Sequence, residues 1–215
     1  MTNYELVEFA KSKIGTPYVY GMKGSVMTLA KYNQLKQMYG DLVWNSDRNK
    51  VGKVCCDCSG LISWATGIMR GSSQYKNVAT KIYPISTIKT APIGALVWKQ
   101  GHIGIYIGLE NGVPYYIAED GSTYGCRKNK ISNSSFTHWF LCTDVIYISK
   151  EEINKEDKEE EEDMVRYNSI NEVPTWGKDT VQKMLEKKMI ADKNNMDLSE
   201  DMLRVFVMLD RNGTI

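Results

Sequence analysis

The stretch GHIGIYIGLENGVPYYIAED, Gly101 to Asp120, decides the fold class of this 215-residue chain. Its isoleucines fall on alternate residues, which is the pattern of a strand that buries one face. The turn Glu110-Asn111-Gly112 then leads into a second apolar run, as in an antiparallel hairpin. The same alternation predicts four strands: Ala95 to Trp98, His102 to Ile107, Tyr115 to Ala118 and Val145 to Ile148.

Helical patterns precede these strands. Thr2 and Glu5 form a capping box, after which apolar residues recur at helical spacing until Gly15. A second helix is expected from Asp57, its N-cap, to about Gly71. Helices followed by antiparallel strands predict an α+β domain.

A long segment, Met22 to Lys53, separates the two helices. Leu29, Leu35 and Met38 recur in it at roughly helical spacing, which predicts a helix and a loop over the cleft. Two interpretations are open. Either substrate selection resides in this segment, or it is a surface insertion without a role in binding.

Charge divides the chain into three parts. Residues 1 to 149 hold 16 Lys and Arg against nine Asp and Glu, a basic balance that favours anionic partners. The segment KEEINKEDKEEEED, Lys150 to Asp163, holds nine acidic residues and a single apolar one, so it predicts an acidic linker. We therefore expect one domain over residues 1 to 149 and a second over residues 164 to 215.

Residues 164 to 215 predict a helix-turn-helix unit. Apolar residues from Val181 to Met189 share one face, and the polar turn Asp192 to Asn195 follows. Asp197 and Glu200 form a second capping box ahead of another apolar face. Neither helix can bury its face alone, so we expect the unit to pack against a copy of itself, a partner or the first domain.

The chain lacks the marks of an exported or membrane-spanning protein. It has no run of about 18 apolar residues, and its start, MTNYELVEF, has no basic head followed by an apolar core. We therefore expect a protein made in the cytoplasm, without membrane insertion. Five cysteines, three of them at Cys55, Cys56 and Cys58, favour free thiols over a disulfide framework.

Cys58 and His102 are the candidate catalytic pair. Cys58 lies at the expected start of a helix, where the dipole and free N–H groups favour a thiolate and lower a thiol pKa from about 8.5. His102 heads a strand after Gly101, so its imidazole can project from the strand end toward a packed helix. We expect Glu119, at the end of the next strand, to fix the imidazole tautomer, with Asp120 as the alternative.

Structural interpretations stand beside this one. Buried cysteines are usually inert, and a histidine at a strand end is often structural. Cys55 and Cys58 also form a CxxC, the spacing of zinc ligands and of thioredoxin-type redox sites, but no second ligand pair follows. We expect His138 to be structural and Cys126 and Cys142 to be packing residues.

Three motifs resemble, in order and spacing, the signature of the NlpC-like cell-wall cysteine peptidases, a papain-like family. They are GTPYVYG at Gly15 to Gly21, DCSGL at Asp57 to Leu61 and GHIGIYIG at Gly101 to Gly108. The segments KVCCDCSGLI, YYIAEDGSTYG and FTHWFL extend the resemblance to the endolysin and prophage branch of Gram-positive hosts. It covers residues 3 to 148 and implies a papain-like fold, with N-terminal helices packed on an antiparallel sheet.

The resemblance also implies roles for individual residues. Catalysis falls to Cys58 as nucleophile, His102 as base and Glu119 as third residue, and substrate binding to Tyr18, Asp57 and Ser59. Tyr20 stands where the family has tryptophan, and a single Gly21 stands where it has two glycines. We expect these departures to affect the shape of the pocket and not the chemistry.

The implied activity is hydrolysis of amide bonds in peptidoglycan stem peptides, without metal or cofactor, most often at the bond from D-glutamate to the diamino acid. An N-acetylmuramoyl-L-alanine amidase and an inactive wall-binding phage protein are the alternatives.

Residues 164 to 215 resemble helical modules of clostridial amidases and endolysins, which implies wall binding or oligomerisation. Expected partners are peptidoglycan and anionic wall polymers, not nucleic acid. A phage endolysin would remain in the host cytoplasm until holin-type release.

Overall fold

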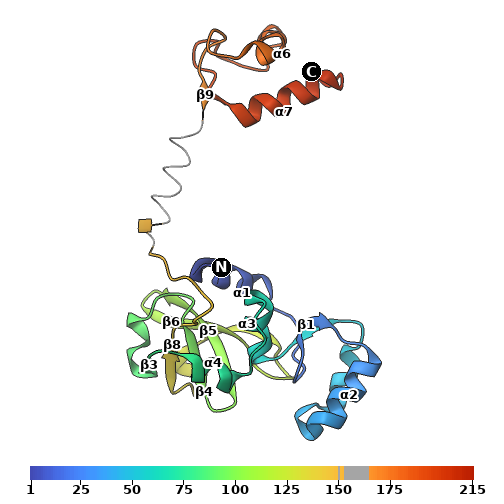
Figure 1. Cartoon of the computed structure of the whole chain (residues 1–215), viewed down its shortest axis with the longest axis vertical. Coiled ribbons are helices and arrows are strands. Elements are labelled where there is room, and N and C mark those ends of the chain that lie inside the picture. Colours follow the sequence, from blue (N-terminus) through green and yellow to red (C-terminus); the bar gives the residue numbers. More distant parts are fainter. Residues whose placement is uncertain (150, 153–164) are drawn as a thin grey trace. The chain divides into compact units, whose positions relative to one another are not determined.

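The computed structural model describes residues 1–149, 151–152 and 165–215. They form two compact units, Met1–Ile148 and Ser149–Ile215 (Figure 1). The predicted acidic linker, Lys150 to Asp163, lies outside the described residues except for Glu151 and Glu152. No helix within the described ranges is both long and apolar enough to cross a membrane.

A six-stranded sheet forms the centre of the first unit (Figure 1). Its strand order is β3-β8-β4-β5-β6-β7, and every neighbouring pair is antiparallel. The strands are β3 (Ile82–Pro84), β4 (Leu96–Lys99), β5 (His102–Glu110), β6 (Val113–Glu119), β7 (Cys126–Lys130) and β8 (His138–Phe140). The predicted hairpin is the β5–β6 pair, where Asn111 and Gly112 both adopt the positive φ of a type I′ turn. The α+β fold class is confirmed.

Different parts of the unit cover the two faces of the sheet. The α-helices of this unit outside the 22–56 segment are α1 (Asn3–Ser12), α3 (Cys58–Thr66) and α4 (Ser72–Val78). Ile103 and Ile105 of β5 point into the core that α1 and α3 share with the sheet. Tyr106 points into a second core on the other face, around Phe136. Because side chains alternate along a strand, His102 belongs to the Phe136 face.

Capping signals set the helix boundaries. Thr2 and Glu5 form the predicted capping box of α1. Asp57 caps α3, also as predicted, but the expected end near Gly71 is wrong. The helix ends at Thr66, because Gly67 takes a left-handed conformation with φ 74°.

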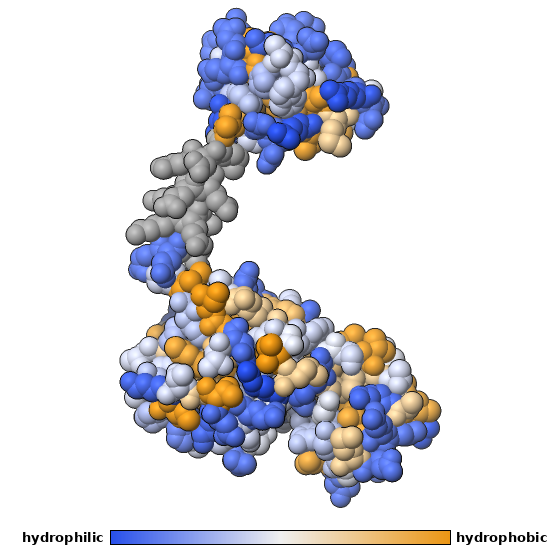
Figure 2. All heavy atoms as spheres, viewed as in Figure 1, coloured by the Kyte–Doolittle hydropathy of each residue, from blue (hydrophilic) through white to orange (hydrophobic). Residues whose placement is uncertain are grey.

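The segment between the first two motifs folds as a small lobe, here called the α2 lobe (residues 22–56). It consists of β1 (Lys23–Val26), α2 (Leu29–Tyr39), the 3-10 helices η1 (Gly40–Leu42) and η2 (Asn45–Lys50), and β2 (Val54–Cys56), which pairs with β1. The predicted helix is thus present. Leu35, Val43 and Cys55 lie in its own apolar core. Figure 2 shows apolar colour on its surface as well, where large apolar side chains are exposed: Val26, Leu29, Met38, Leu42 and Trp44.

One predicted strand, Val145 to Ile148, is wrong. This segment makes a single bridge, from Ile146 to Thr2, and Ile146 is mostly exposed. Its apolar pattern reflects packing near the start of α1, where Val145 joins the core and Asn3 bonds to the Ile148 backbone. Two further 3-10 helices, η3 (Ile85–Thr90) and η4 (Ile131–Asn133), complete the unit.

The second unit contains the two predicted helices, α6 (Thr175–Glu186) and α7 (Glu200–Arg211). It also contains a two-residue antiparallel pairing of β9 (Arg166–Tyr167) with β10 (Leu198–Ser199), which the expectation of an all-helical module misses. Ser199 caps α7 in place of the predicted Asp197, whose φ is 48°. The helices α6 and α7 pack most tightly where Gly177 contacts Leu203. A Cβ at that glycine would lie 2.9 Å from the leucine side chain.

Candidate active site

Cys58 is the first residue of α3, immediately after the N-cap Asp57. The strand β2 leads into this turn, and the Asp57 N–H donates to the Met22 carbonyl at 2.8 Å. Gly60 faces the same carbonyl so closely that a Cβ there would lie 2.3 Å from it. The glycine of the DCSGL motif therefore allows the helix start to pack against the α2 lobe.

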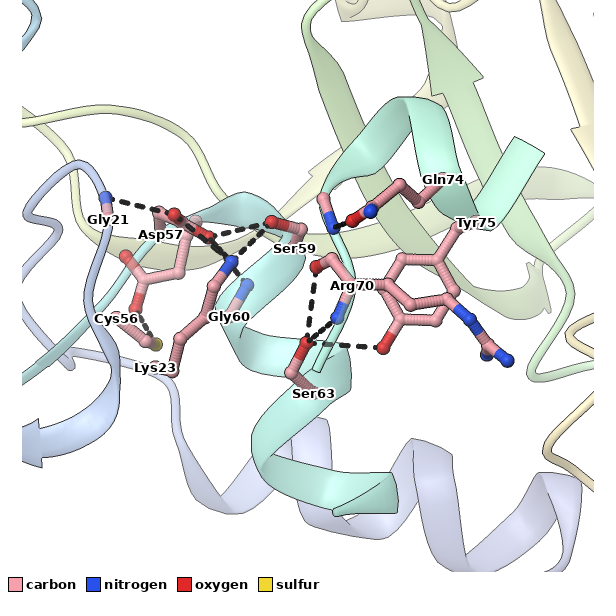
Figure 3. Close-up of polar contacts among 12 residues, drawn as sticks. Gly21, Lys23, Cys56, Asp57, Ser59, Gly60, Ser63, Arg70, Gln74 and Tyr75 are labelled. Atoms are coloured by element: carbon pink, nitrogen blue, oxygen red, sulfur yellow. Dashed lines mark hydrogen bonds and ion pairs between the residues drawn. The ribbon is translucent and has the colours of Figure 1, made fainter. Parts of the chain in front are cut away.

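The Asp57 carboxylate is surrounded by donors (Figure 3). It accepts hydrogen bonds from the Gly21 N–H at 3.0 Å, the Gly60 N–H at 2.6 Å and the Ser59 hydroxyl at 2.9 Å. The Lys23 ammonium pairs with both of its oxygens. Asp57 and Ser59 were expected to bind substrate, and both line the hollow at Cys58. Lys23 was not anticipated, since it belongs to no motif.

The Cys58 side chain is almost fully buried, and its surroundings decide its protonation. Burial raises the pKa of the thiol to about 12, with the negative charge of Asp57 acting in the same direction. Backbone N–H groups of Ile103 and Ser59 and the Lys23 cation oppose this rise. The helix start thus acts in the predicted direction, but it does not prevail. At neutral pH the sulfur carries its proton, so an attack on a substrate requires a base.

His102, the first residue of β5, lies against a fixed carboxylate. Its Nε2 is 3.1 Å from Asp120 Oδ1, and its ring stacks on Phe136 with centroids 5.4 Å apart. Arg127 Nε and the Tyr116 hydroxyl donate to the other Asp120 oxygen, at 2.7 and 3.2 Å. Burial alone would raise the pKa of Asp120, but the hydrogen bonds from His102 and Arg127 outweigh it and lower the pKa. Asp120 is therefore ionised and oriented toward the imidazole.

Glu119 takes a different place from the one expected. It is fully buried, and its Oε1 accepts from the Cys56 thiol at 2.9 Å. Its Oε2 has no hydrogen-bond partner in the described part of the chain. Glu119 is the last residue of β6 and Asp120 follows it, and their side chains point apart, Glu119 toward Cys56 and Asp120 toward His102. Of the two carboxylates that the sequence offered, the structure pairs Asp120 and not Glu119 with the imidazole.

Replacing Glu119 by glutamine is expected to remove a pH dependence of stability. Burial raises the pKa of Glu119 from 4.5 to about 8, so between these values the folded chain holds a proton that the unfolded chain has released. The free energy of unfolding of the wild type therefore falls as the pH rises from about 4.5 to 8, by a few kcal/mol in order of magnitude. A glutamine cannot ionise and should not show this fall.

Urea unfolding at pH 5, 7 and 9 measures the effect. Tryptophan fluorescence reports mainly on the first unit, which holds four of the five tryptophans. The stability difference between the two proteins should grow in favour of the glutamine variant from pH 5 to pH 9. An equal pH dependence in both proteins would show that Glu119 is not protonated in the folded chain.

Two adjoining hollows lie beside the candidate pair, Cys58 and His102. The imidazole hollow, about 430 Å³, is lined by Tyr18, His102 and Asp120 among others. The thiol hollow, about 610 Å³, is lined by Cys58 and its neighbours. Gln100 and Gly101 line both. No hydrogen bond joins the Cys58 sulfur to the His102 ring among the described residues.

Aromatic side chains frame both hollows. Tyr18 lines the imidazole hollow, and burial together with the nearby Cys58 and Asp57 raises its pKa well above the ordinary range. Tyr20 lines the thiol hollow and packs edge-on against Tyr39 of α2, with ring centroids 5.0 Å apart. Two residues of the α2 lobe, Lys23 and Tyr39, thus line the thiol hollow.

A buried ion pair in the α2 lobe binds two segments that border the imidazole hollow. Asp47 is fully buried, and its carboxylate binds the Lys50 ammonium at 2.7 Å and the Ser122 hydroxyl at 3.2 Å. Lys50 also donates to the carbonyls of Tyr18 at 2.7 Å and Ser122 at 3.0 Å. The loop that follows Asp120 is thus held by the lobe.

The remaining candidate residues lie outside this arrangement. His138 Nδ1 is 2.9 Å from the neighbouring Thr137 hydroxyl, and its ring adjoins Trp98. Cys55, Cys126 and Cys142 are buried, and all five cysteines are free. Within the described ranges no group of three or more His, Cys, Asp or Glu side chains is arranged to hold a metal ion.

Comparison with known proteins returns structural similarities only. No family model matches the chain, and no curated protein is significantly similar to it. The NlpC/p60 domain of the peptidoglycan hydrolase SagA is 18% identical, with a TM-score of 0.42 over 65% of this chain and 98% of that one. NlpC1 from Trichomonas vaginalis is 16% identical, with a TM-score of 0.43 over 65% and 43%. The P60 domain of an antigen from M. avium subspecies paratuberculosis is 21% identical, with a TM-score of 0.43 over 65% and 93%.

Proposed function

We propose that this protein is a peptidoglycan hydrolase that cleaves an amide bond of the stem peptide with Cys58 as nucleophile. The observation that supports this most is the juxtaposition at the two hollows. A cysteine at a helix start and a histidine oriented by a carboxylate open onto adjoining space that shares Gln100 and Gly101. The three motifs that resemble the NlpC-like peptidases supply these residues in the expected order.

The chemistry follows from the protonation of the two groups. His102 Nε2 faces Asp120, so Nδ1 is the ring nitrogen that takes the thiol proton when a substrate is bound. The sulfur then attacks the amide carbonyl, and Asp120 stabilises the imidazolium that forms. Backbone N–H groups at the start of α3 stabilise the oxyanion, and His102 returns the proton to the leaving amine. Water then releases the acyl group from the sulfur.

Within this class we propose a phage endolysin that cuts the bond from D-glutamate to the diamino acid and reaches the wall after holin-type release. Digestion of purified Gram-positive sacculi, followed by mass spectrometry of the soluble products, tests the bond. A split stem peptide with a new amino group on the diamino acid identifies an endopeptidase. An intact stem peptide whose N-terminal L-alanine carries a free amino group identifies the amidase alternative. Binding to sacculi without any released amine identifies an inactive wall-binding protein.

For the second unit, Ser149–Ile215, we propose wall binding, with anionic wall polymers as one ligand and oligomerisation as the alternative. A chain of residues 1–148 is expected to keep its hydrolytic rate on soluble muropeptides, because that unit has its own core. It should lose most of its retention on sacculi in a sedimentation assay. Retention equal to that of the full chain would place wall affinity in the first unit. Size-exclusion chromatography with light scattering of both chains distinguishes oligomerisation.

A further inference from the structure

Lys23 lies beside the nucleophile, although none of the three motifs contains it. It opens β1 in the α2 lobe, and only 21% of its side chain is exposed. Its ammonium donates to the two Asp57 oxygens at 2.9 and 3.2 Å and to the Ser59 hydroxyl at 2.6 Å (Figure 3). An ammonium has three N–H donors, and these three oxygens of the protein accept all of them.

We propose that Lys23 is a positioning residue for Cys58: it neutralises Asp57 and holds the Asp57 and Ser59 side chains, so that the thiolate forms beside a paired carboxylate. The proposal rests on the function proposed above, in which Cys58 is the nucleophile. It assigns a role in the reaction to the α2 lobe, because the lobe supplies this lysine.

The need for such a counter-ion follows from the position of Asp57. This carboxylate caps α3 and holds the Gly21 backbone, so its charge is fixed next to Cys58. A like charge at this distance disfavours the thiolate, whereas a cation favours it. Accordingly, Asp57 raises the pKa of Cys58 and Lys23 lowers it. Without Lys23, the developing thiolate would face an unpaired anion in a buried site.

The other titratable groups near the sulfur do not take over this role. Tyr18 and Tyr20 approach it from the segment before β1, and both have raised pKa values, so they are neutral. His102 lies at the start of β5, on Asp120. Arg70 lines the same hollow but pairs with Asp144.

The experiment measures the reactivity of Cys58 directly, without a wall substrate. Full-length wild type, Lys23→Met, Lys23→Arg, Asp57→Asn and the Lys23→Met/Asp57→Asn double variant are alkylated with iodoacetamide between pH 6 and 9. Modification of Cys58 is followed by peptide mass spectrometry. The other four cysteines are at most 3% exposed and should not react in the folded chain. Lys53→Met, at an exposed lysine of the same lobe, is the matched control.

Below the pKa of a thiol, the alkylation rate follows the thiolate fraction, so a pKa shift appears as the same fold-change at every pH. We expect Lys23→Met to react about tenfold more slowly than wild type, which corresponds to about one pKa unit. Lys23→Arg and Lys53→Met should react at the wild-type rate. Asp57→Asn should react faster than wild type, and the double variant should return to within about threefold of it.

Each outcome decides the proposal. A folded Lys23→Met protein that reacts as fast as wild type overturns it, as does Asp57→Asn reacting no faster than wild type. If Lys23→Met shows no cooperative thermal transition and is therefore not folded, the result with Asp57→Asn still decides the proposal. Alkylation rates that follow the expected order, in a protein that releases no amine from sacculi, support the role of Lys23 and contradict the hydrolase instead.

Discussion

Replacement of Cys58 by serine is expected to lower the release of amino groups from purified cell walls by at least about 10⁴-fold, as loss of the nucleophile does in other acyl-transfer enzymes. A serine hydroxyl is far less acidic than a thiol and is a weaker nucleophile, so removal of its proton and its attack on the carbonyl are both slower. The measurement combines the turbidity of a wall suspension with quantification of new free amines.

The matched controls are Cys58→Ala and Cys142→Ser. Cys142 is buried away from both hollows, so its replacement should leave the rate per folded molecule close to that of the wild type. Equal clearing by wild type and Cys58→Ser would remove Cys58 as the nucleophile. Clearing without new amines in the wild type would point to cleavage of glycan rather than peptide.

Replacement of Asp120 by asparagine is expected to lower the turnover number by about 10² to 10⁴-fold, with a much smaller change in KM. In the proposed mechanism, Asp120 orients His102 and stabilises its positive charge in the transition state. An asparagine preserves the volume but removes the charge, and its amide can hold the imidazole in the wrong tautomer. Steady-state kinetics on a soluble muropeptide measure the effect.

A comparison of Glu119→Gln with Asp120→Asn tests which carboxylate is the third residue of the proposed mechanism. Because the pKa of Glu119 is raised to about 8, a neutral amide closely resembles the carboxyl that is present at pH 7. We expect this variant to retain a rate within about fivefold of wild type at pH 7. If Glu119→Gln lost its activity while Asp120→Asn kept its activity, Glu119 and not Asp120 would be the third catalytic residue.

The parts of the fold that the sequence predicts are those with strong local signals. The β5–β6 hairpin has both alternation and a turn that demands positive φ, and α1 and α3 carry side-chain caps. The strands β3 and β7 lie at the edges of the sheet, and β8 joins β3 to β4. These strands are short, and the sequence CRKNK of β7 has little apolar pattern. Their conformation comes from pairing with neighbours, which a local pattern does not record.

The choice between Glu119 and Asp120 shows why the site was only partly predictable. Adjacent residues of a strand face opposite sides, so an uncertainty of one residue in the pairing exchanges the two carboxylates. The β5–β6 register shifts between Tyr106 and Gly108, and local alternation does not reveal such an irregularity. Lys23 was not predictable at all, because it reaches Asp57 across 34 residues through the pairing of β1 with β2.

The Lys50 contacts have a consequence for local unfolding. This one ammonium binds the backbone of Tyr18, the buried Asp47 and the loop after Asp120, three segments distant in the sequence. Opening the Tyr18 segment or the loop after Asp120 removes a hydrogen bond from this ammonium, and unfolding of η2 removes its ion pair with Asp47 as well. We therefore expect the α2 lobe and the rim of the imidazole hollow to open together, so that amide hydrogen exchange in the two regions shows the same protection.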